Sequence, residues 1–430
     1  MLETIRYKST NLPWCPVIPK HWEVKKLKFI TYIKARVGWH GLKADEFFFD
    51  GNGAYCITGT DFTNRIINWD SCYKVPFERF EEDPYIQLKE NDLLITKDGT
   101  IGKVALVKNL IGKATLNSGV FVVRPEGDDY YNEYLYWILQ SNFMTEFIKY
   151  TSRGSTIVHL YQDVFENMEI IFPPLQKQHL IAEYLDEKTT LIDDLISKKQ
   201  LLIERLREER TAIINQAVTK GIDPNAEMKD SGVEWIGEIP KDWEVKKLKY
   251  LTKLREETID VCDFKIAVEN IESESGMLVL MDNERNYQST LSRFNSGDIL
   301  FNKLRPYLHK VYFAERDGGA FGELLVISSI GHILPKYLFY ILFSKGFINV
   351  VNSSTQGTKM PRANWDGFIN QLKLAYPKNK VDQQEIIEYI ETNCRSIEEN
   401  IGRFEKEIEL FKEYKSALIN EAVTGKKIIE

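Results

Sequence analysis

The sequence predicts an α+β protein with two similar globular domains, separated by two long helices that pack as an antiparallel coiled coil with pseudo-two-fold symmetry. Three observations lead to this fold class. The chain of 430 residues contains one unit twice, each copy has strand-like runs separated by glycine-bearing turns, and each copy ends in a long helical stretch. Two copies of a unit in one chain form a pseudo-dimer, which suits a ligand with two parts.

The clearest repeat is a stretch of thirteen residues. Residues 18–30 and 239–251 are identical at ten of thirteen positions, at an offset of 221. A second repeat, Ile-Asn-Gln-Ala-Val-Thr at 214–219, returns as Ile-Asn-Glu-Ala-Val-Thr at 419–424. We interpret the repeated Trp22 and Trp243 as core anchors, because positions shared by both copies serve the common fold. Specificity is then expected where the copies differ.

Four segments follow from this repeat. The first domain covers residues 1–172, the central long helix 173–221, the second domain 222–377 and the C-terminal long helix 378–430. Strand-like runs in the first domain are 92–96, 104–107 and 120–123, and helical patterning covers 131–150. The matching runs in the second domain are a strand at 297–301 and a helix at 337–342.

The two helical segments are long and carry continuous apolar stripes. No glycine or proline interrupts 175–220, which is preceded by Pro173 and Pro174 and followed by Gly221. One globular domain covers such a length poorly, so we expect the helices to pack on each other, in antiparallel orientation. The alternative is that each helix folds back on its own domain.

Composition excludes several classes of protein. Hydrophobic content of 43% and charged content of 28% are ordinary globular values, and no apolar run is long enough to span a membrane. The five scattered cysteines favour reduced thiols, and the polar N-terminus has no apolar signal core, so we expect a cytoplasmic protein. The net charge of −7 suggests that, if the chain binds nucleic acid, partner subunits supply part of the contacts with its phosphates.

Several segments resemble those of the specificity subunits of Type I restriction-modification systems. Residues 14–27 and 233–245 look like the openings of that family's recognition domains, and 98–107 looks like its mid-domain motif. Residues 303–311 are similar to a variant of that motif, and Phe-Pro-Pro-Leu-Gln-Lys-Gln at 172–178 resembles the junction into the long helix. The resemblance covers the whole chain. The second junction lacks the double proline, which leaves open whether both helices are entered alike.

The resemblance implies a sequence-specific DNA-binding subunit without catalytic residues. Each target recognition domain would read one half of a bipartite target in double-stranded DNA. The helices would act as a ruler and dock two methyltransferase (modification) subunits. S-adenosylmethionine, ATP and Mg are then expected in partner subunits and no cofactor in this chain. A restriction and translocase subunit can join such complexes. The target sequence and the gap length are not encoded in any pattern that we can read.

The motifs agree with a non-catalytic role. The chain has no Asn/Asp-Pro-Pro-aromatic loop for holding a flipped adenine, no phosphate-binding loop and no GxGxxG. Glu-Val-Lys at 23–25 and 244–246 has the local pattern of a nuclease, without a well-placed upstream aspartate, and we interpret it as part of a solvated opening turn. A self-contained nuclease or methyltransferase remains one alternative, and a duplicated coiled-coil scaffold without DNA readout is the other.

The candidate DNA contacts are polar loop residues that can donate to phosphates or base edges. Glycines in these loops let the backbone approach DNA closely. The alternatives are a plain hairpin with solvated lysines in the first domain and a surface ion-pair network in the second. A basic cluster near Gly38 and Gly41 is a further candidate. The complete set is Lys97, Thr100, Lys103, Arg153, Ser155, Thr156, Arg36 and Lys43 in the first domain, and Lys303, Arg305, Tyr307, Gln356, Thr358, Lys359 and Arg362 in the second.

Overall fold

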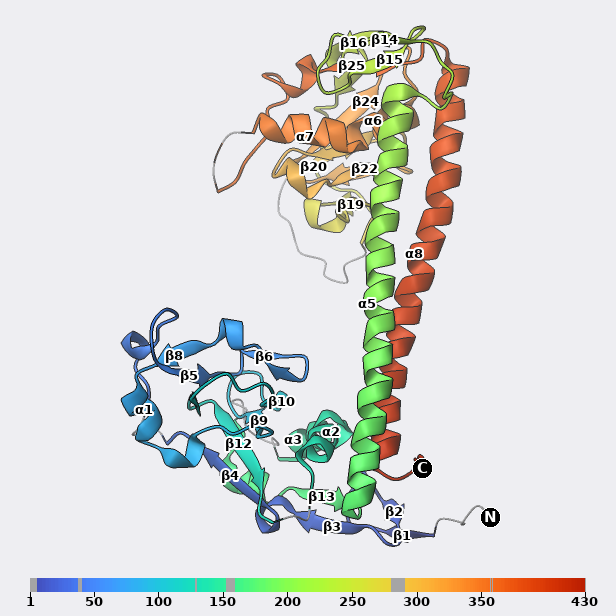
Figure 1. Cartoon of the computed structure of the whole chain (residues 1–430). Helices are drawn as coiled ribbons and strands as arrows, with labels where there is room; N and C mark the ends of the chain where they lie inside the picture. Colours follow the sequence, from blue (N-terminus) through green and yellow to red (C-terminus); the bar gives the residue numbers. More distant parts are fainter. Residues whose placement is uncertain are drawn as a thin grey trace. The chain divides into compact units, whose positions relative to one another are not determined.

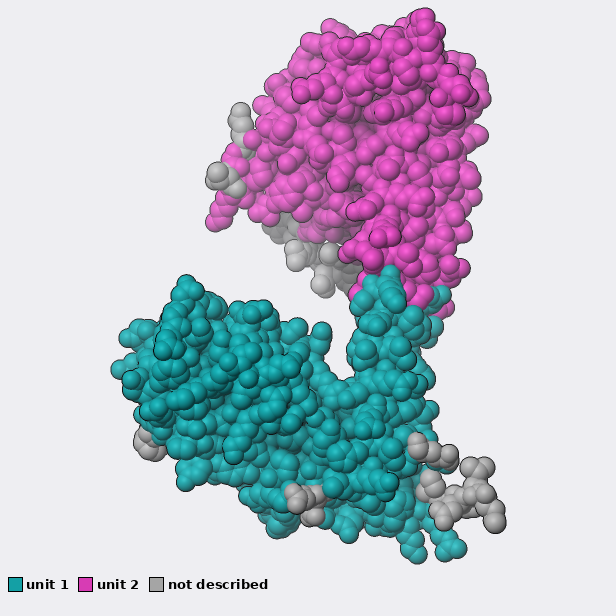
Figure 2. Space-filling model, viewed as in Figure 1, with its two compact units in different colours: residues 1–198, 407–430 teal, residues 199–406 magenta. Residues whose placement is uncertain are grey.

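The computed structural model describes residues 6–37, 41–127, 130–151, 159–279, 291–355, 357 and 359–429. The chain forms two compact units (Figure 2). Unit 1 comprises Met1–Lys198 and Glu407–Glu430, and unit 2 comprises Lys199–Lys406. Each unit therefore combines one sheet-rich domain with a stretch of both long helices, a division that cuts across the four segments of the sequence.

The domain of unit 1 is built on a six-stranded sheet of order β4-β12-β9-β10-β7-β6 (Figure 1). A three-stranded sheet, β11-β5-β8, and the pairs β1-β2 and β13-β3 complete it. The strands are β1 (Tyr7–Ser9), β2 (Val17–Pro19), β3 (Glu23–Lys26), β4 (Thr31–Ala35), β5 (Ala54–Ile57), β6 (Phe62–Thr63), β7 (Ile66–Ile67), β8 (Tyr73–Val75), β9 (Leu93–Thr96), β10 (Val104–Leu106), β11 (Ala114–Leu116), β12 (Val120–Pro125) and β13 (Glu169–Phe172).

The core of this domain lies on both faces of the central strands. Along β9, Leu93 and Ile95 join the cluster that includes the helices, while Leu94 joins a smaller cluster on the other face. Successive side chains of a strand point to opposite faces, so both faces of the sheet are covered. The continuous apolar runs of the sequence follow from this burial on two sides.

Helices α1 (Phe77–Glu81), α2 (Asn132–Gln140), α3 (Asn142–Thr151) and α4 (Gln162–Glu166) complete the domain. The single helix predicted at 131–150 is two helices. Ser141 interrupts it, because its hydroxyl donates to the Ile138 carbonyl at 2.5 Å and accepts from the Phe143 amide at 3.3 Å. A serine hydroxyl that bonds to nearby backbone competes with helix continuation and starts a new helix instead.

The domain of unit 2 has the same plan, with two four-stranded sheets in place of the six-stranded and three-stranded sheets of unit 1. The sheet orders in unit 2 are β17-β24-β21-β22, β18-β20-β23-β19, β16-β25 and β14-β15, and helices α6 (Pro335–Phe343) and α7 (Lys345–Ser353) correspond to α2 and α3. The strands are β14 (Met228–Asp230), β15 (Glu238–Pro240), β16 (Glu244–Lys247), β17 (Thr252–Leu254), β18 (Thr258–Ile259), β19 (Lys265–Ile266), β20 (Leu291–Phe294), β21 (Ile299–Asn302), β22 (Val311–Phe313), β23 (Gly318–Ala320), β24 (Leu324–Ser329) and β25 (Lys373–Tyr376).

The long helices are α5 (Leu175–Lys220) and α8 (Lys380–Val423). Within unit 1, Lys415 of α8 bonds to Asp193 of α5 at 2.7 Å. Within unit 2, Arg210 of α5 pairs with Glu398 of α8. Arg207 of α5 also pairs with Glu405 of α8 within unit 2, and Lys427, which follows α8, lies over Tyr184 of α5 within unit 1. Within each unit the partner number therefore falls along α8 as it rises along α5, so the helices are antiparallel in both units. The predicted antiparallel pair is therefore confirmed.

Each domain also packs on the end of the helix from the other copy. The core of unit 1 includes Ala422 and Val423 at the end of α8, and the core of unit 2 includes Ala217 and Val218 at the end of α5. These residues belong to the repeated Ile-Asn-Gln/Glu-Ala-Val-Thr motif. Trp22 and Trp243 are 2% and 4% exposed, which confirms their prediction as core anchors.

Candidate nucleic-acid interface

The basic loop of unit 1 connects β9 to β10 and is shaped by a buried threonine. Thr96 is 2% exposed, and its hydroxyl donates to the Thr100 carbonyl at 2.5 Å and accepts from the Lys103 amide at 3.0 Å. Gly99 and Gly102 have φ of +70° and +80°, a region that favours glycine. Thr100 and Lys103 are exposed at the surface of this loop.

Lys97 joins three segments at this strand end. Its amide donates to the Gly119 carbonyl at 2.9 Å, and its carbonyl accepts from the Leu160 amide at 3.0 Å. Its ammonium lies 5.3 Å from the centre of the Phe121 ring, and the neighbouring Asp98 pairs with His159. The β9–β10 loop, the turn before β12 and the segment that leads into α4 therefore meet at one place.

Unit 2 repeats this arrangement with different residues. Asn302, 2% exposed, takes the place of Thr96, and its side-chain amide exchanges two hydrogen bonds with Leu304, at 2.6 and 3.0 Å. The Lys303 amide donates to the Glu323 carbonyl at 3.1 Å, and the Lys303 carbonyl accepts from the Ala363 amide at 2.9 Å. Lys303 thus bridges the same three segments as Lys97.

Arg305 holds the basic loop of unit 2 against the segment around residue 360. Its φ is +53°, its amide donates to the Pro361 carbonyl at 2.7 Å, and its guanidinium donates to the Lys359 carbonyl at 3.1 Å. Tyr307 lies in the 3-10 turn Pro306–Leu308 and is 53% exposed. The predicted residues Lys303, Arg305, Tyr307 and Lys359 are therefore brought together.

Arg362 also lies in this cluster, in an ion pair. Its guanidinium lies 2.5 Å from Glu323, with side-chain exposures of 53% and 32%. A DNA phosphate would have to compete with this carboxylate for the guanidinium. The ion-pair alternative raised for unit 2 thus applies to Arg362.

The prediction for Arg36 is wrong. This side chain is 1% exposed, and its guanidinium donates to the Leu116 carbonyl at 2.8 Å and to the Thr115 hydroxyl at 3.0 Å. A guanidinium satisfied inside the domain is not offered to DNA, so Arg36 is structural. Lys43, from the same cluster, is exposed. Arg153, Ser155, Thr156, Gln356 and Thr358 lie outside the described residues.

Sequence reasoning missed the residues that shape the loops and their neighbours. Thr96 and Asn302 precede the paired lysines at an offset of 206, a signal that is present in the repeat. The turn at Asn117–Gly119 adds an exposed Ser118 beside Lys97. Glu323 is a carboxylate within the basic cluster of unit 2, and no local pattern indicates it.

The Glu-Val-Lys motifs lie on strands β3 and β16 and not in solvated turns. Glu23 and Lys25 are 3.1 Å apart, and Glu244 and Lys246 are 2.8 Å apart. Hydrogen bonds from Lys246 and Tyr376 lower the pKa of Glu244 to about 2. This carboxylate is therefore ionised, and its negative charge is already paired with Lys246. Among the described residues no group of three or more His, Cys, Asp or Glu could hold a metal ion.

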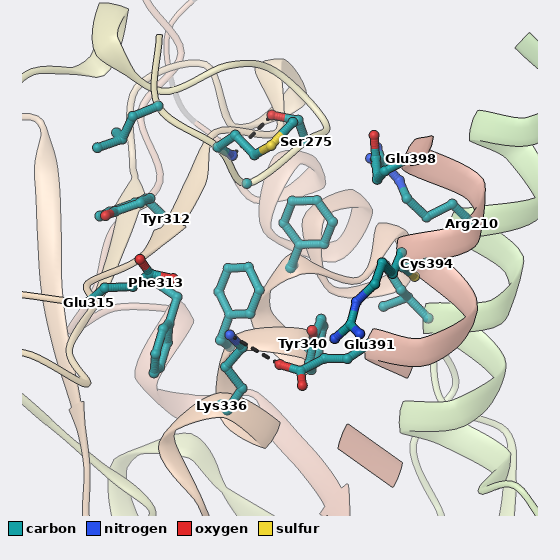
Figure 3. Close-up of a pocket in the computed structure, with 17 residues that line it drawn as sticks. Arg210, Ser275, Tyr312, Phe313, Glu315, Lys336, Tyr340, Glu391, Cys394 and Glu398 are labelled. Carbon is teal, nitrogen blue, oxygen red and sulfur yellow. Dashed lines mark hydrogen bonds and ion pairs between the residues drawn. The ribbon is translucent and has the colours of Figure 1, made fainter. Parts of the chain in front are cut away.

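A cavity of about 620 Å³ lies in unit 2, between α6, a hairpin at 271–278 and the long helices (Figure 3). Tyr340 and Phe339 form part of its wall, and Lys336 pairs with Glu391 at 3.2 Å on its rim. Gly276 of the hairpin also lines it.

The corresponding place in unit 1 is filled by an arginine. Arg65, from the β6–β7 hairpin, has its guanidinium carbon 5.0 Å from the centre of the Tyr136 ring and 5.2 Å from that of Trp137. It also pairs with Asp186 of α5. Tyr136 and Trp137 correspond to Phe339 and Tyr340 at an offset of 203, so Arg65 packs in unit 1 on the residues equivalent to part of the cavity wall in unit 2.

Two similar domains, each attached to a pair of long antiparallel helices and each presenting a basic loop, define a class of two-headed recognition subunit. A sequence profile described as "Type I restriction modification DNA specificity domain" matches residues 19–205. The chain is 25% identical to the MjaVIII specificity subunit of Methanocaldococcus jannaschii, over 95% of this chain and 93% of that protein. It is 26% identical to the MjaIX specificity subunit of the same organism, over 96% and 95%. Residues 19–205 therefore form a Type I restriction-modification DNA specificity domain, and the chain as a whole is similar to the specificity subunits of these systems.

Solved structures share this fold. A chain from a structure described as showing complex assembly and conformational transition of the type I R-M system superposes with a TM-score of 0.72. The alignment covers 95% of this chain and 99% of that one, at 12% identity. The HsdS subunit of Thermoanaerobacter tengcongensis gives a TM-score of 0.53, covering 95% and 98% at 12% identity. Its similarity to specificity subunits over nearly the whole length identifies the chain as a recognition subunit and not a catalytic one. No helix among the described residues is long and apolar enough to cross a membrane.

Proposed function

We propose that each domain reads one half of a bipartite target in double-stranded DNA, and that α5 and α8 act as a ruler and dock two modification subunits. The observation that carries the proposal is the repeated loop. Both domains present basic residues at the same strand end, shaped by a buried Thr96 in one and a buried Asn302 in the other. A shared frame with different exposed residues is what two different half-sites require.

The partners supply the chemistry in this proposal. The modification subunits hold S-adenosylmethionine and methylate adenine, and a restriction and translocase subunit uses ATP and Mg. In this proposal the chain supplies only the recognition of the DNA sequence. The acidic total charge of −7 is consistent with partners that share the phosphate contacts.

Charge reversal in the loops tests the DNA contact. Lys103→Glu and Lys303→Glu should weaken DNA binding by the assembled methyltransferase, because each side chain is expected to neutralise a phosphate. The slope of log affinity against log salt should become shallower by about 0.9 for each phosphate that is no longer neutralised. Lys89→Glu is the matched control, since Lys89 is exposed and precedes β9 at the end opposite to Lys97. Wild-type affinity and slope in both loop variants would exclude the loops as the interface.

Methylation mapping tests the reading of a split target. Adenine methylation across the genome is compared in cells that carry the chain with its methyltransferase and in cells that lack the chain. The proposal predicts loss of methylation at one split motif. If methylation is unchanged at every motif, while the chain still binds its methyltransferase, the chain is a scaffold without DNA readout.

A further inference from the structure

Two buried glutamines attach each domain to the start of its own long helix. The Gln178 side-chain carbonyl accepts from the Tyr131 amide at 2.9 Å, and its amide donates to the Pro173 carbonyl at 2.9 Å. Gln383 accepts from the Leu334 amide at 2.8 Å and donates to the Pro377 carbonyl at 2.8 Å. Both glutamines are 0% exposed. Each therefore ties the start of a domain helix, α2 or α6, to the start of a long helix.

Two asparagines make a second attachment, to the long helix of the other copy. The Asn420 side-chain carbonyl, near the end of α8, accepts from the Asn142 amide of α3 at 2.8 Å. The Asn215 side-chain carbonyl, near the end of α5, accepts from the Lys345 amide of α7 at 2.9 Å. Both pairs, Gln178 with Gln383 and Asn215 with Asn420, have an offset of 205. The arrangement is thus a property of the repeated unit.

The bonded groups explain why amide side chains are used. The first N–H groups of a helix have no partner inside the helix, and an acceptor supplied by another element satisfies one of them. Water would satisfy it equally but would not join two elements. Ser141 and Ser344 accept from other amides in the first turn of these helices, at Phe143 and Phe347. The asparagine bond is therefore dispensable for starting α3 or α7, yet it links the domain to the long helices.

The glutamine attachments and the asparagine attachments differ in how deeply their side chains are buried. The glutamines are inaccessible, so their removal would leave buried polar groups unpaired and disturb folding. Asn215 and Asn420 are half-buried at the edge of the contact. Their removal should leave the fold and the apolar contact with the helix end in place while removing one of the two directional hydrogen-bonded attachments.

We infer that Asn215 and Asn420 are positioning residues that hold each recognition domain at one orientation on the helix pair and so restrict the gap length of the split target. The inference rests on the proposed function. A domain held at two points presents its basic loop in one direction. Apolar packing against Ala422 and Val423 in unit 1, or against Ala217 and Val218 in unit 2, has no fixed direction, so a domain without the asparagine bond can tilt on that contact and reach half-sites at neighbouring spacings.

The test measures gap selectivity in the assembled methyltransferase. Plasmids carry the two half-sites at the native gap and at gaps one base pair shorter and longer, and methylation at each gap is quantified. In the Asn215→Ala, Asn420→Ala double variant, the preference for the native gap should fall about fivefold, the change in population that corresponds to removing one helix cap. The half-site sequences should stay the same.

Two control variants separate positioning from general stability. Asn215→Asp with Asn420→Asp keeps the acceptor oxygen and should restore the native preference. Asn393→Ala removes an asparagine of α8 whose side-chain amide donates to the Tyr389 carbonyl of its own helix at 2.7 Å. It should lower stability slightly without changing gap preference. Single Asn→Ala variants replace the double variant if the latter does not assemble.

Each result has a separate meaning. Unchanged gap preference in folded alanine variants would overturn the inference and leave the proposed function intact. A loss of preference shared by Asn393→Ala would assign the effect to stability and also overturn it. If the wild-type complex methylates no split target, the proposed function itself fails.

Discussion

At the scale of single residues, one buried polar side chain shapes each basic loop. Thr96 and Asn302 have the same place and burial but bond to different backbone groups, the carbonyl of Thr100 and the amide of Lys103 in one loop and both backbone groups of Leu304 in the other. A side chain of this kind sets the path of the loop without meeting DNA. Under the proposed function, specificity then depends on buried residues as well as exposed ones.

Asn302→Ala should therefore damage the loop of unit 2. It leaves backbone groups of Leu304 without their side-chain partner, which costs about 1–3 kcal/mol where the groups are buried. We expect a lower thermal midpoint for unit 2 and weaker DNA binding. Thr96→Ala should act in the same way on unit 1. Normal affinity in a destabilised Asn302→Ala variant would show that the loop path does not depend on this amide.

His309 follows the 3-10 turn Pro306–Leu308 of the same loop, and we expect it to make the stability of unit 2 sensitive to pH. It is 7% exposed, its Nε2 donates to the Phe343 carbonyl at 2.5 Å, and burial lowers its pKa from the usual value near 6.5. Because the folded pKa is below the unfolded one, the contribution to stability is complete above about pH 6.5 and is lost as pH falls below it. Thermal midpoints at pH 7.5 and 5.5 should differ more in the wild type than in His309→Gln, which cannot titrate. Equal differences would remove His309 as the cause.

At the scale of elements, the repeat places an ion pair between the two long helices at two equivalent positions. The two pairs differ in how exposed their side chains are. Asp193–Lys415 and Glu398–Arg210 correspond at an offset of 205. The side chains of the first pair are 55% and 29% exposed, whereas Arg210 is 8% exposed. An exposed pair contributes little, and a buried guanidinium without its carboxylate is costly.

Glu398→Gln should thus destabilise the protein more than Asp193→Asn. We expect about 1–3 kcal/mol for the first change, because Arg210 stays buried with a weaker partner, and below about 1 kcal/mol for the second. Chemical denaturation of both variants at the same salt concentration measures the difference. Equal effects would mean that exposure does not decide the contribution of this pair.

At the scale of the whole molecule, each domain packs on the start of one long helix and the end of the other. The contact from Asn142 to Asn420 spans 278 residues of sequence. Both helices therefore form part of both units, and a change in one helix alone would disturb the ion pairs and cores that the two share. Changes to helix length have to be made in both helices together.

Insertion of three heptads into both helices, between the two units, tests the proposed ruler. About 21 added residues lengthen each helix by about 32 Å, or about nine base pairs of DNA, and keep the apolar stripe in register. We expect the methylated target to keep both half-sites and to acquire a longer gap. Methylation mapping of the variant measures this. An unchanged gap would rule out the ruler while leaving each domain as a DNA reader.

The sequence by itself determined the repeated plan, the two long helices, the central strands and the place of the basic loops. These features depend on local patterns, namely apolar periodicity, glycine and proline at element ends, and one motif written twice. Only the tertiary structure decided that Lys103 is exposed and Arg36 buried, that Arg362 is paired with Glu323, and that the end of α8 completes the first domain. Those outcomes depend on contacts between residues far apart in the chain, and a local pattern does not specify its distant partner.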